Sequence, residues 1–190
     1  DLNQRIDHVA LVGTEEREEL VALGRGDYAQ PPRQDVLAPI ERAFVEHAPR
    51  AALIGDGDGI GDTLTYAELA QHVSALAREL QAKGVVRGSR VGLFLTRGVD
   101  EPIAMLAALK IGAAYVPLDP SHPAERVAKI IEDATPEVLL THSALMGSIV
   151  VPSDTVVLAL DTLWPTLLQN PGSPSDVVHD AADLAYILFT

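Results

Sequence analysis

The sequence contains no cysteine. This absence excludes a disulfide scaffold, a thiolate zinc site and a cysteine nucleophile. Aromatic residues are scarce, at 4% of the 190 residues, whereas hydrophobic residues together reach 47%, so we expect a globular domain with an aliphatic core. Basic residues are outnumbered, with 14 Lys and Arg against 27 Asp and Glu, and the net charge of −13 would repel the phosphate backbone of a nucleic acid.

A membrane-spanning run is lacking as well. The most hydrophobic stretch, residues 103–118, contains Lys110 and Pro117 and is too short to cross a bilayer. The first residues, from Asp1 on, have neither an initiating Met nor the charged and then apolar pattern of a signal peptide. We therefore expect an excised piece of a cytoplasmic protein that has neither nucleic acid nor a membrane as a partner.

Residues 1–35 have the composition of an extended linker that wraps on a neighbouring domain. Thr14 can cap a short helix over Glu15–Leu23, because the helix dipole favours acidic residues in the first turn, and Gly24 and Gly26 are expected to end this helix. The two prolines within Tyr28–Gln34 predict extended backbone there.

From Val36 onward, the spacing of apolar residues alternates between helix and strand. The expected helices cover residues 36–47, 99–111 and 123–134, and one more lies between a Thr65–Glu68 capping box and Gly84. The expected strands cover residues 51–54, 63–64, 90–95, 114–118, 137–141, 155–160 and 184–189. The helix over 36–47 should bury one face, made of Val36, Ile40, Phe44 and Val45.

The order of these elements predicts the fold class. The first two strands form a hairpin, and the later apolar strands are separated mainly by helices. This pattern indicates an α/β fold in which helices cover both faces of a parallel sheet. Ligands of such sheets bind beyond the carboxyl ends of the strands. Residues 169–180 are polar and are interpreted as a surface loop.

The Gly/Asp-rich run Gly55–Asp62 allows three interpretations. Asp56, Asp58 and Asp62 could bind calcium, but the EF-hand pattern requires Glu at the position that Ala67 occupies. The run also lacks the G-x-G-x-x-G spacing of a dinucleotide loop and an immediately following helix. Because Gly and Asp tolerate positive φ, a hairpin turn is the favoured interpretation.

The remaining polar residues form no recognisable constellation. Lys110 can be a functional cation, although its place at the end of an apolar helix favours a role at the helix dipole. Asp119 and Asp161 are interpreted as caps, and Ser143 lacks the G-x-S-x-G of a hydrolase elbow. Surface or cap positions are expected for the scattered histidines, His8, His47, His72, His122, His142 and His179. We therefore predict no catalytic residue and no metal site within the chain.

Three segments, in order, resemble the early core motifs of adenylation domains from nonribosomal peptide synthetases. Residues 64–69, LTYAEL, are similar to the first motif, L-T-Y-x-E-L. Residues 109–119, LKIGAAYVPLD, are similar to the second motif, L-K-A-G-x-A-Y-V-P-I-D, and PAER at 123–126 fits the P-x-x-R that follows it. Residues 184–190, LAYILFT, resemble the opening of the third motif, L-A-Y-x-x-Y-T-S-G-T-T-G-x-P-K-G, with Phe where Tyr is usual.

The resemblance implies that residues 36–190 are the N-terminal part of an adenylate-forming enzyme core, and that residues 1–35 are a condensation-to-adenylation linker. Such enzymes use ATP and Mg²⁺ to convert an amino acid or a related carboxylic acid into an acyl-adenylate. They then pass the acyl group to the phosphopantetheine thiol of a carrier-protein domain, and the implied neighbour is a condensation domain. The third motif is a phosphate-binding loop, and Thr190 is its first hydroxyl, so Thr190 is the residue that we nominate for cofactor binding.

Other functions stay open at this point. An acyl-CoA or aryl-acid ligase of the same superfamily would share the fold and the adenylation step, and a non-catalytic binding or docking module would share the fold alone. A dinucleotide-binding oxidoreductase also fits the α/β pattern but lacks the glycine fingerprint. Because the rest of the loop and the acid-binding pocket would lie downstream, the resemblance implies that this fragment alone is inactive. For the same reason, the sequence does not identify the acid that is activated.

Overall fold

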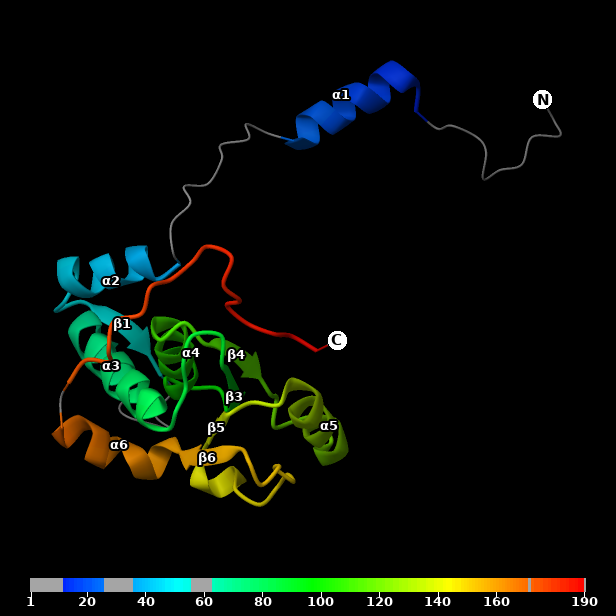
Figure 1. Cartoon of the computed structure of the whole chain (residues 1–190). Coiled ribbons are helices and arrows are strands. Elements are labelled where there is room, and N and C mark those ends of the chain that lie inside the picture. Colours follow the sequence, from blue (N-terminus) through cyan, green and yellow to red (C-terminus); the bar gives the residue numbers. More distant parts are fainter. Residues whose placement is uncertain (1–11, 26–35, 56–62, 171, 190) are drawn as a thin grey trace. The chain divides into compact units, whose positions relative to one another are not determined.

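The computed structural model describes residues 12–25, 36–55, 63–170 and 172–189, and it divides the chain into two units, Asp1–Arg33 and Gln34–Thr190. In the first unit, helix α1 spans Thr14–Arg25 and buries none of its residues (Figure 1). The predicted helix over 15–23 is confirmed. The helix continues through the first predicted stop, Gly24, because a single glycine in the last turn costs only about 1 kcal/mol, and it ends at Arg25; the second predicted stop, Gly26, lies outside the described residues. The extended stretch expected over 28–34 lies almost wholly outside the described residues.

A four-stranded parallel sheet organises the second unit (Figure 1). Its strands are β3 (Arg90–Phe94), β4 (Ala114–Pro117), β5 (Val138–Thr141) and β6 (Val156–Ala159), in the order β4-β3-β5-β6. Each of these strands lies within a predicted range, and all the pairings are parallel, which confirms the predicted α/β fold with a parallel sheet.

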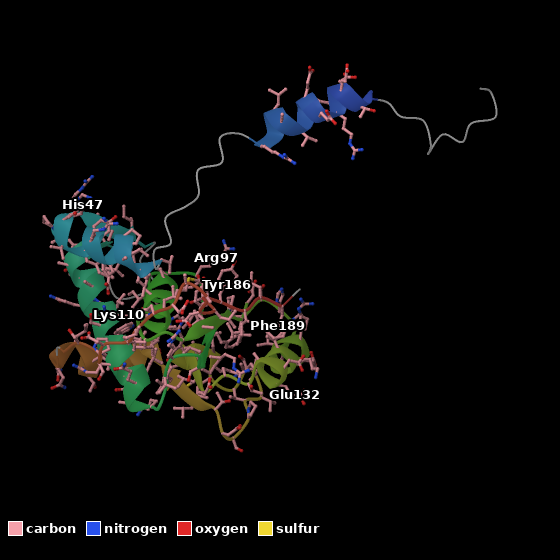
Figure 2. The ribbon with its side chains drawn as sticks, turned by 45° about the horizontal axis from the view of Figure 1, so that its top comes forward. His47, Arg97, Lys110, Glu132, Tyr186 and Phe189 are labelled. Carbon is pink, nitrogen blue, oxygen red and sulfur yellow. The ribbon has the colours of Figure 1, made fainter. Side chains whose placement is uncertain are left out.

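Helices cover both faces of this sheet. On one face, helix α5 (Ala124–Ala134) packs Val127 and Ile131 against Phe94 and Leu139 of the strands. Polar residues of α5 point outward, and Glu132 is labelled among them in Figure 2.

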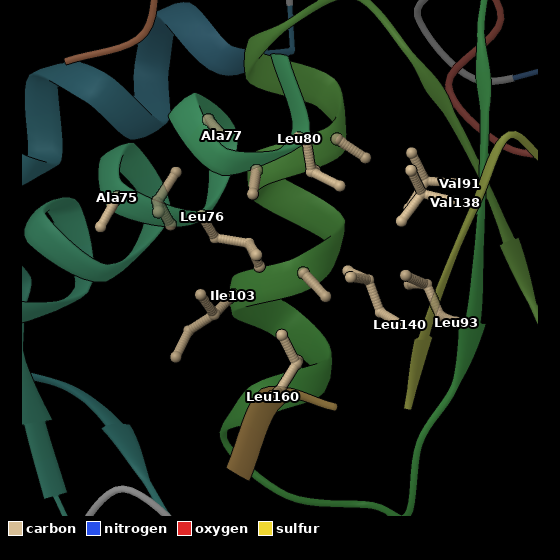
Figure 3. Packing of buried hydrophobic residues seen from close by; sticks show 14 of the residues in the cluster. Ala75, Leu76, Ala77, Leu80, Val91, Leu93, Ile103, Val138, Leu140 and Leu160 are labelled. Carbon is tan, nitrogen blue, oxygen red and sulfur yellow. The ribbon is translucent and has the colours of Figure 1, made fainter. Parts of the chain in front are cut away.

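The other face carries α3 (Tyr66–Ala82), α4 (Asp100–Lys110) and α6 (Leu160–Gln169). In Figure 3, Leu76 of α3 and Ile103 of α4 lie on one side of α4, and Leu93 and Leu140 of the strands lie on its other side; all four belong to one core cluster. Along β3, Leu93 therefore belongs to one core cluster and Phe94 to the other, as the two-residue period of a strand requires. Leu76 and Ile103 are fully buried, so this interface is the main core of the chain's described part.

The elements before the sheet match their predictions except for one helix face. Strands β1 (Ala51–Ile54) and β2 (Thr63–Thr65) pair antiparallel, and the turn between them lies mostly outside the described residues. Helix α2 spans Leu37–Glu46, and the predicted burial of Val36 and Val45 is wrong, since they are 55% and 80% exposed. The inward face of α2 consists instead of the buried Leu37 and the half-buried Ile40 and Phe44, which follow one another at helical spacing.

Two predictions at the carboxyl end differ from the structure. The strand expected over 155–160 ends at Ala159, and Leu160 begins α6, a helix that the sequence pattern did not predict because Pro165 lies inside it. The strand expected over 184–189 is reduced to one parallel bridge between Tyr115 and Tyr186. The described residues 172–180 have no regular structure, in agreement with the predicted loop.

A buried carboxylate joins three of these elements. Asp100, in the first turn of α4, is 5% exposed. Its Oδ1 accepts a hydrogen bond of 3.0 Å from Trp164 Nε1 of α6, and its Oδ2 lies 2.8 Å from Nε2 of His142, which follows β5. Both oxygens thus have a partner, which a buried carboxylate requires.

The predicted capping box starts helix α3. The Glu68 N–H donates to Thr65 Oγ1 at 3.2 Å, and the Thr65 N–H donates to Glu68 Oε2 at 2.8 Å. The donation from the Thr65 N–H, together with that from its hydroxyl, lowers the pKa of Glu68 below its usual value of 4.5. A carboxylate with a lowered folded-state pKa stabilises the fold above its unfolded-state pKa, and this stabilisation is lost as the pH falls through the folded-state pKa.

None of the helices in the described ranges has the length and apolar character needed to cross a bilayer.

We predict that Thr65→Ala lowers the free energy of unfolding by about 1 kcal/mol, because the Glu68 N–H loses its acceptor. Urea unfolding followed by circular dichroism measures this change. Thr65→Ser keeps the hydroxyl and should unfold at nearly the same urea concentration as the unchanged chain. Equal midpoints for the Ala and Ser variants would contradict the prediction.

We predict that Asp100→Ala lowers the free energy of unfolding by about 2–4 kcal/mol, because the Trp164 N–H is left buried without an acceptor. The same urea titration applies. Asp133→Ala removes an exposed acid that pairs with Lys129 on α5, and its midpoint should not change. A midpoint for Asp100→Ala equal to that of this control would show that the buried contacts contribute nothing.

Candidate functional site

The carboxyl ends of β3, β4 and β5 lie at the same edge of the sheet. Strand β3 lies between β4 and β5, so the strand order reverses there. The crossover helix α4 packs on one face and the next crossover helix, α5, packs on the other. The two connections diverge at this point, and open α/β sheets bind their ligands in the crevice that results.

A groove of about 660 Å³ opens at the carboxyl ends of β3 and β4. Arg97 and Phe189, both labelled in Figure 2, line it. Its other lining residues are Leu95, Thr96, Glu101, Pro117, Leu118, Asp119, Pro120, Ser121, His122, Ile130 and Leu188. The groove is therefore lined by apolar side chains and by side chains of both charges, which suits a polar ligand with an apolar part.

Asp119 shapes the turn that follows β4. Its Oδ1 accepts the Ser121 N–H at 2.8 Å, and this bond holds the pKa of the Asp119 carboxyl below its usual range. The nearby charges of His122 and Arg97 lower it further. Asp119 therefore caps the turn after β4 and not helix α5, whose N-cap residue Pro123 makes no side-chain bond, and the Asp119 carboxylate lines the groove.

Beside the groove, a chain of hydrogen bonds crosses the point where the strand order reverses. A carboxylate accepts only, so His142 Nε2 donates to Asp100. His142 Nδ1 lies 3.2 Å from the Thr96 hydroxyl oxygen, within hydrogen-bond distance. Thr96 follows β3 and His142 follows β5, so this chain ties the two strand ends together.

This order of hydroxyl, imidazole and carboxylate has the chemistry of a nucleophile with its base. Asp100 is already held by Trp164, however, and the imidazole of His142 is 17% exposed. The Asp100 carboxylate thus links α4 both to α6 and to the loop that contains His142. We therefore assign Thr96, His142 and Asp100 a structural role. The sequence analysis placed His142 at a surface or cap position and did not foresee its pairing with Asp100.

Ser143 and Asp161 form a second contact at this edge. Both the backbone N–H and the hydroxyl of Ser143 donate to the Asp161 carboxylate, the first at 2.9 Å. These bonds, the hydroxyl first, lower the pKa of Asp161. Asp161 therefore caps the short 3-10 helix Ser143–Leu145 from a distance rather than the elements next to it in sequence.

Two further candidates have structural partners. Lys110 Nζ lies 2.5 Å from Glu41 Oε1, so the cation in the last turn of α4 also forms an ion pair with α2. His72 is 6% exposed, its Nδ1 lies 2.7 Å from the Glu68 carbonyl, and its ring meets Trp164 edge-on. The expectation of a surface position is thus wrong for His72, because the ring lies on the inward face of α3.

The third motif reaches the groove along the second. Tyr115 of β4 donates its N–H to the Ala185 carbonyl at 3.1 Å, and its own carbonyl accepts the Ile187 N–H at 3.0 Å. The rings of Tyr115 and Tyr186 are 5.6 Å apart. The chain therefore runs parallel to β4 toward the carboxyl edge, where Leu188 and Phe189 line the groove. Thr190, the nominated residue, lies outside the described residues.

Within the described residues, no group of three or more His, Cys, Asp or Glu side chains could hold a metal ion. The calcium interpretation rests on Asp56, Asp58 and Asp62, which also lie outside the described residues.

The sequence analysis did not single out Thr96 and Arg97, which lie at this edge. Thr96 and Arg97 follow an apolar strand, and that position is the one signal that could have pointed to them. The partners in the hydrogen-bond chain are more than 40 positions apart in sequence, so only the strand order brings them together.

Comparison with known proteins agrees with the motifs. A sequence profile of the family described as AMP-binding enzyme matches residues 40–190. A linear gramicidin synthase from Brevibacillus parabrevis is 36% identical over 99% of this chain, and chondramide synthase from Chondromyces crocatus is 34% identical over 100% of this chain. The chain spans about 4% and 5% of the length of these relatives.

Solved structures show the same relationship. The nonribosomal peptide synthetase FmoA3 in its AMPPNP-bound form superposes with a TM-score of 0.76 at 30% identity, over 92% of this chain and 18% of that one. The N-terminal subdomain of Klebsiella oxytoca NpsA, in complex with 3-hydroxybenzoyl-AMSN, superposes with a TM-score of 0.68 at 28% identity, over 86% of this chain and 40% of that one. The resemblance to nonribosomal peptide synthetases is confirmed, and the chain belongs to the family of AMP-binding enzymes.

Proposed function

We propose that residues 36–190 are the N-terminal part of an ATP-dependent adenylation domain, and that residues 1–35 are the linker from a condensation domain. The carboxylate oxygen of an amino acid or a related acid attacks the α-phosphorus of ATP, which is bound with Mg²⁺. The bond from this phosphorus to the pyrophosphate oxygen breaks, and acyl-AMP forms. The phosphopantetheine thiol of a carrier domain then attacks the acyl carbon and displaces AMP. The enzyme works in the cytoplasm.

The observation that carries this proposal is the placement of residues 184–189. They pair with Tyr115 and end in the groove at the carboxyl edge of the sheet, where α/β folds bind nucleotides. Thr190 follows Phe189 directly, so a phosphate loop that begins at Thr190 would begin beside this groove. Exposed N–H groups and hydroxyls of such a loop suit phosphate oxygens.

An aryl-acid ligase is the second candidate. It is favoured by the structural similarity to the NpsA subdomain, which was solved with 3-hydroxybenzoyl-AMSN. The third candidate, a non-catalytic docking module, shares only the fold. Activation of an aryl acid followed by transfer to free coenzyme A would select the second candidate, and failure of the complete protein to turn over any acid would select the third.

We predict that the complete enzyme catalyses ATP–pyrophosphate exchange that depends on one amino acid, and that the chain ending at Thr190 does not. Intact mass and the sequence of the C-terminal peptide first establish where each polypeptide ends. A panel of amino acids and aryl acids is then assayed with both proteins. Turnover by a chain verified to end at Thr190 would overturn the proposed division of the domain.

We predict that Thr190→Ala raises the KM for ATP or lowers the exchange rate of the complete enzyme by about tenfold, because one phosphate-binding hydroxyl is lost. Thr190→Ser keeps the hydroxyl and should retain the rate. Thr166→Ala, at an exposed position of α6 away from the groove, is the matched control. Unchanged kinetics for Thr190→Ala would remove Thr190 from the site.

A further inference from the structure

Residues 172–183, called the strap here, connect α6 to the third-motif residues 184–189. The strap has no regular structure, so its course depends on side-chain contacts. Its first contact is reciprocal: Gln81 of α3 donates from Nε2 to the Ser175 carbonyl at 3.1 Å and accepts the Ser175 N–H through Oε1 at 2.8 Å. One side chain thus satisfies both backbone groups of Ser175, as a neighbouring strand would do.

The second contact lies at the end of the strap. Arg87 Nε donates to Asp183 Oδ2 at 2.8 Å, and Arg87 Nη2 donates to Asp183 Oδ1 at 2.7 Å. Such a bidentate pair fixes direction as well as distance, because the guanidinium and the carboxylate become coplanar. Asp183 Oδ2 also accepts the Asp180 N–H at 3.0 Å, so the same carboxylate closes the last turn of the strap.

The second motif leaves room for this contact. Gly112 has a φ of +72°, and a Cβ there would lie 2.9 Å from Arg87 Cγ and 3.2 Å from Val177 Cγ1. The stem of Arg87 and the strap therefore both pack on the turn that leads into β4. Two residues after Asp183, Ala185 begins the pairing with Tyr115 of the same strand.

We propose that Arg87 is a positioning residue for the ATP phosphate loop, and this inference rests on the proposed function. By holding Asp183, Arg87 sets the register in which Ala185 and Ile187 pair with Tyr115. That register determines where Phe189, and with it the loop that starts at Thr190, meets the groove. Arg87 touches no reactant and acts through the strap.

The exposure of the pair separates this role from a general effect on folding. The side chains of Arg87 and Asp183 are 44% and 28% exposed, and exposed ion pairs contribute little to global stability. Residues 184–189, in contrast, pair with β4 through one bridge, and Leu184, Tyr186 and Leu188 are more than half exposed, so their local order is sensitive to the loss of an anchor. Loss of the pair should therefore change loop placement more than the unfolding temperature.

The test measures ATP–pyrophosphate exchange in the complete enzyme with saturating acid substrate. Arg87→Ala and Asp183→Ala are each expected to raise the KM for ATP about tenfold while the KM for the acid stays within about twofold. Asp183→Ala also removes the acceptor of the Asp180 N–H, so the double variant should be no worse than Asp183→Ala alone. Arg87→Lys keeps the charge but cannot form the two parallel hydrogen bonds, so its KM for ATP should lie between that of the unchanged enzyme and that of Arg87→Ala.

Lys83→Ala is the matched control. Lys83 forms an ion pair with Glu79 on α3, the two side chains are 39% and 22% exposed, and the pair does not involve the strap. Its kinetics should equal those of the unchanged enzyme. If Arg87→Ala leaves the KM for ATP unchanged, or if Lys83→Ala raises it equally, Arg87 has no positioning role. A fall in unfolding temperature that accounts for the lost activity would also overturn the proposal.

Amide hydrogen exchange gives a readout that does not depend on the proposed reaction. The Ile187 N–H donates to the Tyr115 carbonyl, and Arg87→Ala should speed its exchange about tenfold while the core amides of β3 keep their rates. Faster exchange of the Ile187 N–H in a protein that turns over no acid would support the positioning role of Arg87 and refute the proposed function. Unchanged exchange of the Ile187 N–H would refute the positioning role itself.

Discussion

Burial of β3 on both faces and along both edges is the constraint on which the remaining structure depends. This strand pairs with β4 on one side and β5 on the other, and at Gly92 a Cβ would lie 2.7 Å from Leu139 Cδ1. Because no water reaches such a strand, apolar helices must cover both faces, and the crossovers α4 and α5 pack on opposite ones. The strand ends then meet at one edge with a crevice between them.

The motifs that carry the family resemblance are neighbours in space. The backbone of Tyr115, in the second motif, pairs with Ala185 and Ile187 in the third. Gly112 of the second motif leaves room for the stem of Arg87, which holds Asp183 just before the third. The second motif is therefore more than a helix–strand junction: it supports the segment that approaches the groove. This gives a physical meaning to the order in which the motifs occur.

Local signals predicted the elements well. The Thr65–Glu68 capping box begins α3, and glycines with positive φ follow α3 and α4 at Gly84 and Gly112. Predictions that depended on context were less accurate. The sequence pattern missed helix α6, which contains Pro165, and residues 184–189 form one bridge instead of the predicted strand. His72 is buried because its helix turns that face toward Trp164, which sequence spacing alone does not show.

The α/β class, the positions of most helices and strands, and the family resemblance could be predicted from the sequence, because capping, periodicity and motif order are properties of short segments. Which side chains meet depends on the tertiary fold. Thr96 contacts His142 across 46 positions, and Arg87 contacts Asp183 across 96. These contacts follow from the strand order β4-β3-β5-β6 and from the path of the strap. Both arise from long-range packing of the whole sheet, and no local periodicity records that packing.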